Sequence, residues 1–253
     1  MADRQILLQP AYVLHQRPYR DTSALLELFS PKYGRVGVVA KGVRAAKSRW
    51  RGLLQPFQPL FLSWNLRGEL GTLTGAEAQG PAMTLAPELI ASGFYLNEIL
   101  MRLLERHEAQ WELFGCYDTT LRGMGQILAH DKSRSEELEI LLRQFELKLL
   151  AALGYGLVLD HDVKTGSPVV PEQEYVYQLE YGPVPVSPGD FMENYEHGPR
   201  LIGSTLLALQ HGDLSEERVR VESKRLLRWV LGHYLGPKPL QSRNLAQPVT
   251  RHQ

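Results

Sequence analysis

The sequence contains little cysteine and no long apolar run. Cys116 is the single cysteine among 253 residues, which excludes an internal disulfide and any zinc site built on two or more thiolates. No apolar run approaches the roughly 20 residues that a membrane-spanning helix requires. Residues 1–5 lack the basic start of a secretory signal. We therefore expect a soluble, cytoplasmic protein without a bound metal.

Signatures of catalysis are also missing. The sequence has no Gly-x-x-x-x-Gly-Lys phosphate loop. Cys116 lies within a helical pattern, where a free cysteine is commonly a small apolar packing residue. Ser63 and Ser204 lack the flanking glycines of a nucleophile elbow. These absences predict a protein that is not an enzyme and needs no cofactor.

Carboxylates are absent between Glu27 and Glu69, where basic residues are frequent. The basic residues are Lys32, Arg35, Lys41, Arg44, Lys47, Arg49, Arg51 and Arg67. The whole chain has 28 basic and 28 acidic residues, so charge is segregated and a local positive field can exist on a neutral molecule. Phosphates attract cations, and unpaired bases stack on aromatic rings such as those of Tyr33 and Trp50. The segment is typical of a single-strand nucleic-acid surface, although a strand-rich core with a basic polar face would give the same composition.

Residues 41–51 hold the densest part of this basic segment. Gly42 permits backbone freedom, and small alanines leave the surface open to a phosphate chain. We expect a mobile loop in which Trp50 stacks on bases, while Trp64 belongs to the core because it ends an apolar strand. The predicted DNA-binding residues are Lys32, Arg35, Lys41, Arg44, Lys47, Arg49, Trp50 and Arg51.

The hydrophobic pattern divides the chain into a β part and a helical part. Short alternations before residue 80 predict about five strands in a small barrel or sandwich; they span residues 11–17, 23–29, 35–39, 53–64 and 69–73. Two prolines in the fourth stretch, Pro56 and Pro59, imply an edge strand or a bulge. After Gly80-Pro81 apolar residues recur at helical spacing; these segments span residues 96–104, 111–121, 136–153, 202–210 and 217–235. Between them, residues 160–199 are acidic and rich in Pro and Gly, with alternations at 174–179 and 184–186 that allow a small β-ribbon. The expected class is α+β, with domains at 1–80 and 81–253.

Several ordered motifs resemble those of a known family. They are Arg17-Pro-Tyr-Arg-Asp-Thr-Ser23, Tyr33-Gly-Arg35, Ala40-Lys-Gly-Val-Arg44, Lys47-Ser48, Leu54-Gln-Pro-Phe57, Phe145-Glu-Leu-Lys-Leu-Leu-Ala-Ala-Leu-Gly-Tyr155 and Lys238-Pro-Leu-Gln-Ser-Arg243. Together they resemble the RecO family of bacterial recombination mediators over nearly the full length. The resemblance implies a five-stranded OB-fold barrel at 1–80 and a mainly helical domain at 81–253. Many members carry two Cys-x-x-Cys pairs after the central helix, whereas here the first pair falls at Asp162 and Thr165. The resemblance therefore implies a ribbon insertion at 160–199 that lacks zinc and must be held by packing and hydrogen bonds.

The same resemblance implies partners and activities. The implied activities are binding of single- and double-stranded DNA, annealing of complementary strands and help in loading RecA. The implied protein partners are RecR and the acidic C-terminal tail of single-strand-binding protein, with a possible link to RecF. The implied location is the nucleoid. An acidic tail needs an apolar groove rimmed by cations, for which Leu142, Arg143 and Phe145 are the candidates. Arg143 could instead be an exposed helix charge paired with Glu139 or Glu146. An adaptor that binds an acidic protein, or a barrel that binds structured RNA, would use the same cations.

Overall fold

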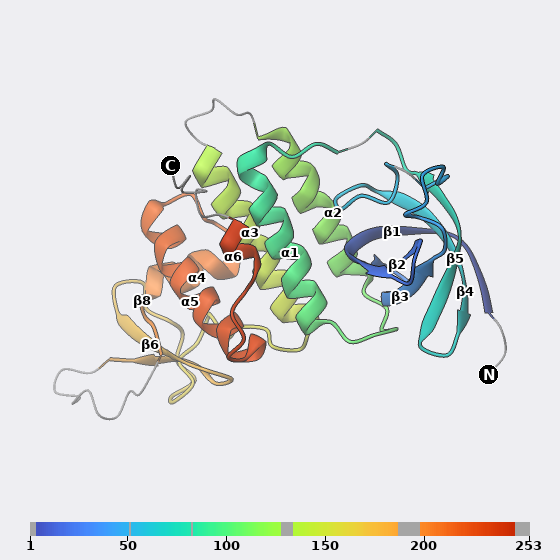
Figure 1. The fold of residues 1–253 in the computed structure, drawn as a ribbon. Coiled ribbons are helices and arrows are strands. Elements are labelled where there is room, and N and C mark those ends of the chain that lie inside the picture. Colours follow the sequence, from blue (N-terminus) through green and yellow to red (C-terminus); the bar gives the residue numbers. More distant parts are fainter. Residues whose placement is uncertain (1–3, 51, 82, 128–133, 187–197, 246–253) are drawn as a thin grey trace. The chain divides into compact units, whose positions relative to one another are not determined.

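The computed structural model describes residues 4–50, 52–81, 83–127, 134–186 and 198–245 (Figure 1). By contacts, the chain divides into two compact units. The first comprises residues 1–130 with 239–253, and the second comprises residues 131–238. The first helices thus belong with the barrel, and the helical part of the chain is shared between the two units.

Five strands form a closed barrel in the order β1-β2-β3-β5-β4. They are β1 (Arg4–Tyr19), β2 (Ser23–Ser30), β3 (Gly34–Ala40), β4 (Leu60–Arg67) and β5 (Leu70–Ala78). Neighbouring strands are antiparallel except for β3 and β5, which are parallel, and β1 closes the barrel by pairing with both β2 and β4. This is the five-stranded Greek-key topology of the OB-fold. The predicted α+β class with an N-terminal OB-fold barrel is confirmed.

Alternating side chains fill the barrel. Leu26 and Leu28 of β2 point inward with Val38 of β3 and Leu62 and Trp64 of β4, and all five are fully buried or nearly so. Strand β1 extends well beyond the stretch predicted at 11–17. The prediction was too short because two irregularities interrupt the period-2 pattern of the strand. They lie between Ile6 and Gln9 and between Val13 and His15. Such bulges bend a strand, which lets one strand pair on both edges of a small barrel.

The predicted fourth strand, residues 53–64, is wrong in its first half. Strand β4 begins only at Leu60, after both prolines, because proline has no N–H to give to the ladder. Residues 41–59 instead form a long connection between β3 and β4, and Pro56 of this connection makes an isolated parallel bridge to Val13.

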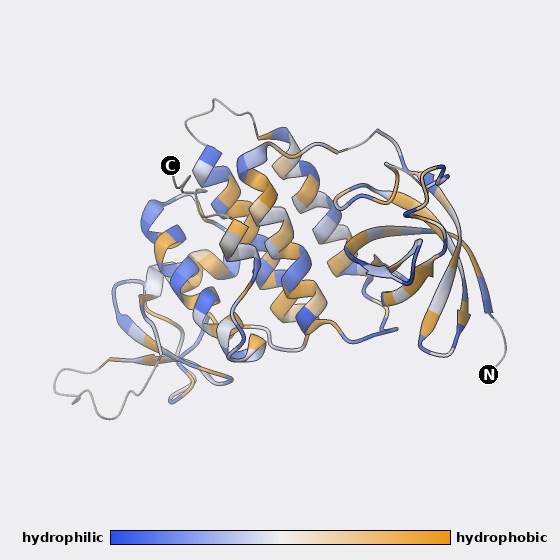
Figure 2. Cartoon of the chain, viewed as in Figure 1, coloured by the Kyte–Doolittle hydropathy of each residue, from blue (hydrophilic) through white to orange (hydrophobic). Residues whose placement is uncertain are grey.

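Helices α1 (Ile90–Leu103) and α2 (Trp111–Gln126) follow a short 3-10 turn at Pro87–Leu89. Figure 2 shows apolar stripes along both helices. Asn97 of α1 donates to the carbonyl oxygen of Leu14 at 2.9 Å, and the hydroxyl of Tyr117 in α2 donates to Asn97 Oδ1 at 2.5 Å. The ring of Tyr12 packs edge-on against the ring of Tyr117 and so extends these contacts to β1. This buried network joins the two helices to the barrel within the first unit.

The C-terminal helix α6 (Ser242–Leu245) returns to the first unit and packs on α1. The carboxylate of Glu98 accepts hydrogen bonds from the backbone N–H groups of Gln241 and Ser242 and from the Ser242 hydroxyl, each at 2.8 Å. One carboxylate therefore caps the start of α6 and fixes the C-terminal segment.

The second unit contains three helices and a small antiparallel sheet in its described part. The helices are α3 (Arg134–Ala152), α4 (Gly203–His211) and α5 (Glu217–Leu235), and the strands are β6 (Glu174–Gln178), β7 (Gly182–Pro185) and β8 (Arg200–Ile202), in the order β7-β6-β8. Strands β6 and β7 match the ribbon predicted at 174–179 and 184–186, whereas the three-residue β8 was not predicted. Residues 187–197 of the predicted insertion lie outside the described residues.

The positions of the missing cysteine pair hold a hydrogen-bonded turn. Asp162 is buried, and its carboxylate accepts from the Lys164 N–H at 2.8 Å and from the Thr165 hydroxyl at 2.7 Å. Gly166, at a φ of 72°, closes the turn by donating its N–H to the Asp162 carbonyl oxygen. Among the described residues no group of three or more His, Cys, Asp or Glu side chains is placed to hold a metal ion. None of the described helices is long and apolar enough to cross a bilayer.

Candidate nucleic-acid interface

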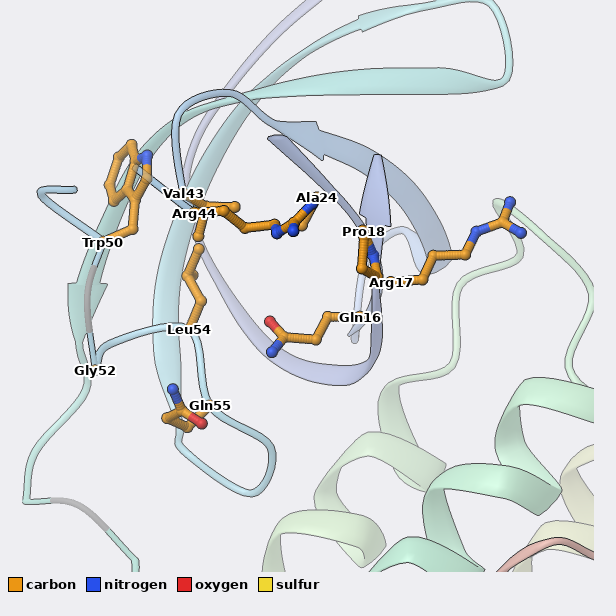
Figure 3. A pocket seen from close by; sticks show the side chains of 10 residues that line it. All are labelled: Gln16, Arg17, Pro18, Ala24, Val43, Arg44, Trp50, Gly52, Leu54 and Gln55. Atoms are coloured by element: carbon orange, nitrogen blue, oxygen red, sulfur yellow. The ribbon is translucent and has the colours of Figure 1, made fainter. Parts of the chain in front are cut away.

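A pocket of about 320 Å³ opens at one end of the barrel (Figure 3). It lies between the end of β1, the start of β2 and the connection at residues 41–59. Its lining residues are Gln16, Arg17, Pro18, Ala24, Val43, Arg44, Trp50, Gly52, Leu54 and Gln55. The lining residues include two arginines and two glutamines but no Asp or Glu, so the pocket does not repel an anionic chain.

The connection that forms one wall of the pocket is held by the barrel. The N–H of Arg44 donates to the carbonyl oxygen of Thr22 at 2.8 Å, and Pro56 bridges to Val13 at the other end. Trp50 and Leu54 are 7% and 2% exposed and belong to the barrel core. The prediction of a mobile loop is therefore not supported over the part of residues 41–59 that the structure describes.

Trp50 is largely buried, which contradicts its predicted role as an open stacking surface. The guanidinium of Arg49 lies over the indole, 4.1 Å from a ring centroid. Burying a tryptophan removes a large apolar surface from water, which is favourable. The indole therefore packs in the barrel core even though the residues around it in the sequence are polar. Trp50 is a lining residue of the pocket, but its low exposure limits the area that a bound strand can contact.

Four of the predicted cations, Lys41, Arg44, Lys47 and Arg49, are exposed in the connection that follows β3. Lys32 is also exposed, but it lies in the β2–β3 turn, at the opposite end of that hairpin from Ala40 and the connection. None of these five makes an ion pair with a carboxylate of the described residues. Arg51 lies outside the described residues. The charges of the five described cations are thus available to phosphate groups.

Arg35 differs from the other predicted cations because its side chain is held within the fold. Its side chain is half-buried, and its Nη1 donates to the carbonyl oxygen of Met101 at 2.8 Å, near the end of α1. Burial, followed by repulsion from the Arg106 guanidinium, lowers the pKa of Arg35 below its ordinary value. Arg106 itself pairs with the buried Glu27. Arg35 is therefore a structural residue that joins β3 to α1.

The prediction from the sequence did not include two further cations at this end of the barrel. Arg17 and Arg20 are exposed at the β1–β2 turn, and Arg17 lines the pocket. The Arg20 carbonyl oxygen lies 3.5 Å from Nη1 of Arg44, which links this turn to the basic connection. Both arginines precede the acid-free segment, and Asp21 beside them hid them from a search for that segment. The motif at residues 17–23 was the signal that could have found them.

The candidates for binding an acidic tail are buried. Phe145 is fully buried, and the Arg143 side chain, 8% exposed, pairs with Glu146 at 2.6 Å. The alternative partner Glu146 is confirmed, but the pair is buried rather than exposed. Leu142 is half-buried on the same helix. The leucine-rich sequence of α3 does not reveal which of its faces is covered, so Leu142, Arg143 and Phe145 do not form the expected surface rim.

Comparison with known proteins gives the same family for both parts of the chain. Residues 4–81 match the family described as "Recombination protein O N terminal", and residues 86–244 match "Recombination protein O C terminal". The "DNA repair protein RecO" of Nitrosococcus oceani is 49% identical over 247 residues, which cover 98% of this chain and 95% of that protein. The proteins of the same name from Nitrosospira multiformis and Methylococcus capsulatus are 45% and 44% identical, over 94% and 95% of this chain and 93% of each relative. The chain belongs to the RecO family of DNA repair proteins.

Proposed function

We propose that this chain is a recombination mediator that binds and anneals single-stranded DNA. The observation that carries the proposal is the group of exposed cations at the end of the barrel where the β1–β2 turn meets the connection at residues 41–59. We define the cationic surface as Lys41, Arg44, Lys47 and Arg49, together with Arg17 and Arg20; Lys32, at the other end of the β2–β3 hairpin, would contact a longer strand separately. Contacts from such cations to phosphates give affinity without sequence preference, which suits a protein that acts on any broken or gapped strand.

A mediator also needs protein partners. The family supports contact with single-strand-binding protein and RecR, and help in loading RecA onto coated strands, with a possible role for RecF. Double-stranded DNA would engage the same cations through its phosphates. An adaptor for an acidic protein, or a barrel for structured RNA, would use these cations too. Competition between DNA and the protein partner for the cationic surface separates the adaptor from the mediator.

The direct test reverses charge on the cationic surface. We expect the variant Lys41→Glu/Arg44→Glu/Lys47→Glu to bind oligonucleotides of any sequence at least tenfold more weakly, because three favourable phosphate contacts become repulsive. A control variant, Lys148→Glu/Lys164→Glu/Arg228→Glu, changes the net charge equally at exposed cations of the second unit. Fluorescence anisotropy with a labelled oligonucleotide measures both affinities.

Annealing is measured separately with complementary strands coated by single-strand-binding protein. Wild-type annealing that the first variant loses and the control keeps supports the proposal. Equal affinity and equal annealing in the wild type and the Lys41/Arg44/Lys47 variant would refute it.

A further inference from the structure

A surface that binds only phosphates does not need the pocket at the end of the barrel. Phosphate contacts need only protruding Lys and Arg side chains, whereas this site also has a depression with apolar walls. Ala24 and Leu54 are buried in those walls, and Val43 packs partly buried against the barrel core. Its volume, about 320 Å³, lies at the lower end of the ~300–1,000 Å³ range of small-ligand pockets. The pocket therefore suits one flat group of nucleobase size.

The polar groups of the pocket match the edge of a base. Gln16 and Gln55 each present an amide that offers both a donor and an acceptor, which is the mixed pattern found on Watson–Crick edges. Arg44 adds a planar guanidinium that can stack on an aromatic ring. In Figure 3, Gln16 and Arg44 extend between the strands and the connection, whereas the guanidinium of Arg17 points away from them. Arg17 is thus placed for the backbone of a strand and Gln16 for its base.

Both walls of the pocket are held in place by backbone bonds. On the barrel side, Gln16 pairs with Leu26 and Pro18 pairs with Ala24 in the β1–β2 ladder. On the other side, the N–H of Leu53 donates to the Trp50 carbonyl oxygen at 3.1 Å, and the buried Trp50 and Leu54 anchor the connection. A preformed pocket loses little conformational entropy when it is filled.

We propose that this pocket receives one unpaired nucleobase of the bound strand, an inference that rests on the DNA binding proposed above. A base in a duplex is paired and stacked, so it cannot enter without being unstacked at a cost of a few kcal/mol. The pocket then gives single strands an advantage that the cations alone cannot give, because duplex and single strand both present phosphates. This defines a recognition element for single-stranded DNA within the barrel.

The test compares two oligonucleotides that carry the same phosphates. One is a labelled oligothymidylate, and the other has the same length but contains abasic tetrahydrofuran units in place of every nucleoside. For the full-length chain in anisotropy titrations, we expect the oligothymidylate to bind at least about fivefold more tightly, since one base contact of ~1 kcal/mol corresponds to that factor. The variant Gln16→Leu/Gln55→Leu should reduce this preference severalfold and leave the affinity for the abasic strand unchanged. A control variant, Gln5→Leu/Gln144→Leu, alters two exposed glutamines outside the pocket and should keep the preference.

The outcomes separate this inference from the proposed function. Equal wild-type affinity for the two oligonucleotides would overturn the base pocket and leave the phosphate contacts intact. A preference that the Gln16/Gln55 variant retains in full would also overturn it, because the bases would then be recognised elsewhere. The absence of binding to either oligonucleotide at low salt would refute the DNA-binding proposal itself.

Discussion

The turn at Asp162 lies where the resemblance to the RecO family implies the first cysteine pair, at Asp162 and Thr165 of this sequence. The contribution of this turn to stability can be measured. Substituting Asp162→Ala removes two hydrogen bonds to a carboxylate, one from the Lys164 N–H and one from the Thr165 hydroxyl. Lys164 is exposed, so water can replace the acceptor for its N–H. Thr165 is exposed as well, but its hydroxyl bonds to the carboxylate of the buried Asp162, and a hydrogen bond to a charged group contributes ~1.5–3 kcal/mol. We therefore expect a local loss of about 2 kcal/mol, mainly from the side-chain bond to Thr165.

Hydrogen exchange at individual amides measures this loss locally. The N–H groups of Val163, Gly166 and Val169 bond to the carbonyl oxygens of Pro183, Asp162 and Asp160 and report opening of the turn. A loss of about 2 kcal/mol corresponds to roughly 30-fold faster exchange. Asp162→Asn keeps one acceptor oxygen and should show a smaller acceleration. Addition of a metal chelator to the wild type should leave exchange unchanged.

The reasoning fails if these three amides exchange at the wild-type rate in the Asp162→Ala variant. It fails equally if Thr165→Val, which keeps the side-chain shape but removes the donor, is as stable as the wild type. In either case, packing alone would hold the segment that precedes β6.

Two further predictions concern the helices. Arg220 in α5 is 5% exposed and donates to the carbonyl oxygens of Leu214 and Ser215 at 3.2 and 2.5 Å and to Glu136 at 3.0 Å. Glu136 and Ser215 are exposed and can be hydrated, whereas Leu214 is buried. Arg220→Met should therefore lower the free energy of unfolding by about 1–3 kcal/mol, mainly through the Leu214 carbonyl left without a donor, as measured by urea denaturation. Burial alone would raise the pKa of Glu98, but hydrogen bonds from Ser242 and Gln241 outweigh it and hold the pKa below its ordinary value of 4.5. A carboxylate with a lowered pKa stabilises the fold at pH values above its ordinary pKa. This stabilisation is lost as the pH falls through the lower pKa of the folded state. Proteolysis of residues 239–245 should therefore accelerate in the wild type as the pH falls through the lowered pKa of Glu98 and be fast already at neutral pH in Glu98→Ala; a wild-type rate in that variant would contradict the cap.

Strongly periodic elements could be predicted from the sequence. The helix expected at 217–235 is α5, Glu217–Leu235, because its apolar stripe is regular and Gly236-Pro237 ends it. The helix expected at 136–153 is α3, Arg134–Ala152, because its leucines recur at helical spacing and Gly154 follows its end. Strand β1 was predicted at less than half its length, since its two irregularities break the alternation on which the prediction depends.

The candidate site could be predicted by its charge but not by its three-dimensional arrangement. The exposure of Lys41, Arg44 and Lys47 follows from a polar segment without apolar periodicity. Arg35 and Trp50 lie in that same segment, yet one contacts the end of α1 and the other enters the barrel core. Both outcomes depend on residues that are distant in the sequence. The pocket itself joins residues 16–18 to residues 43–55, a contact that only the closed barrel creates.

The salt dependence of oligonucleotide binding tests the cationic surface most directly. If about six cations neutralise phosphates of a single strand, the logarithm of the association constant should fall against the logarithm of salt concentration with a slope near −4. Removing three of them in Lys41→Ala/Arg44→Ala/Lys47→Ala should flatten the slope to about −2. A steep wild-type slope that becomes shallower in this variant is the predicted result. A slope that stays the same in both proteins would show that the phosphates are bound elsewhere and would contradict the assignment of the barrel end as the DNA interface.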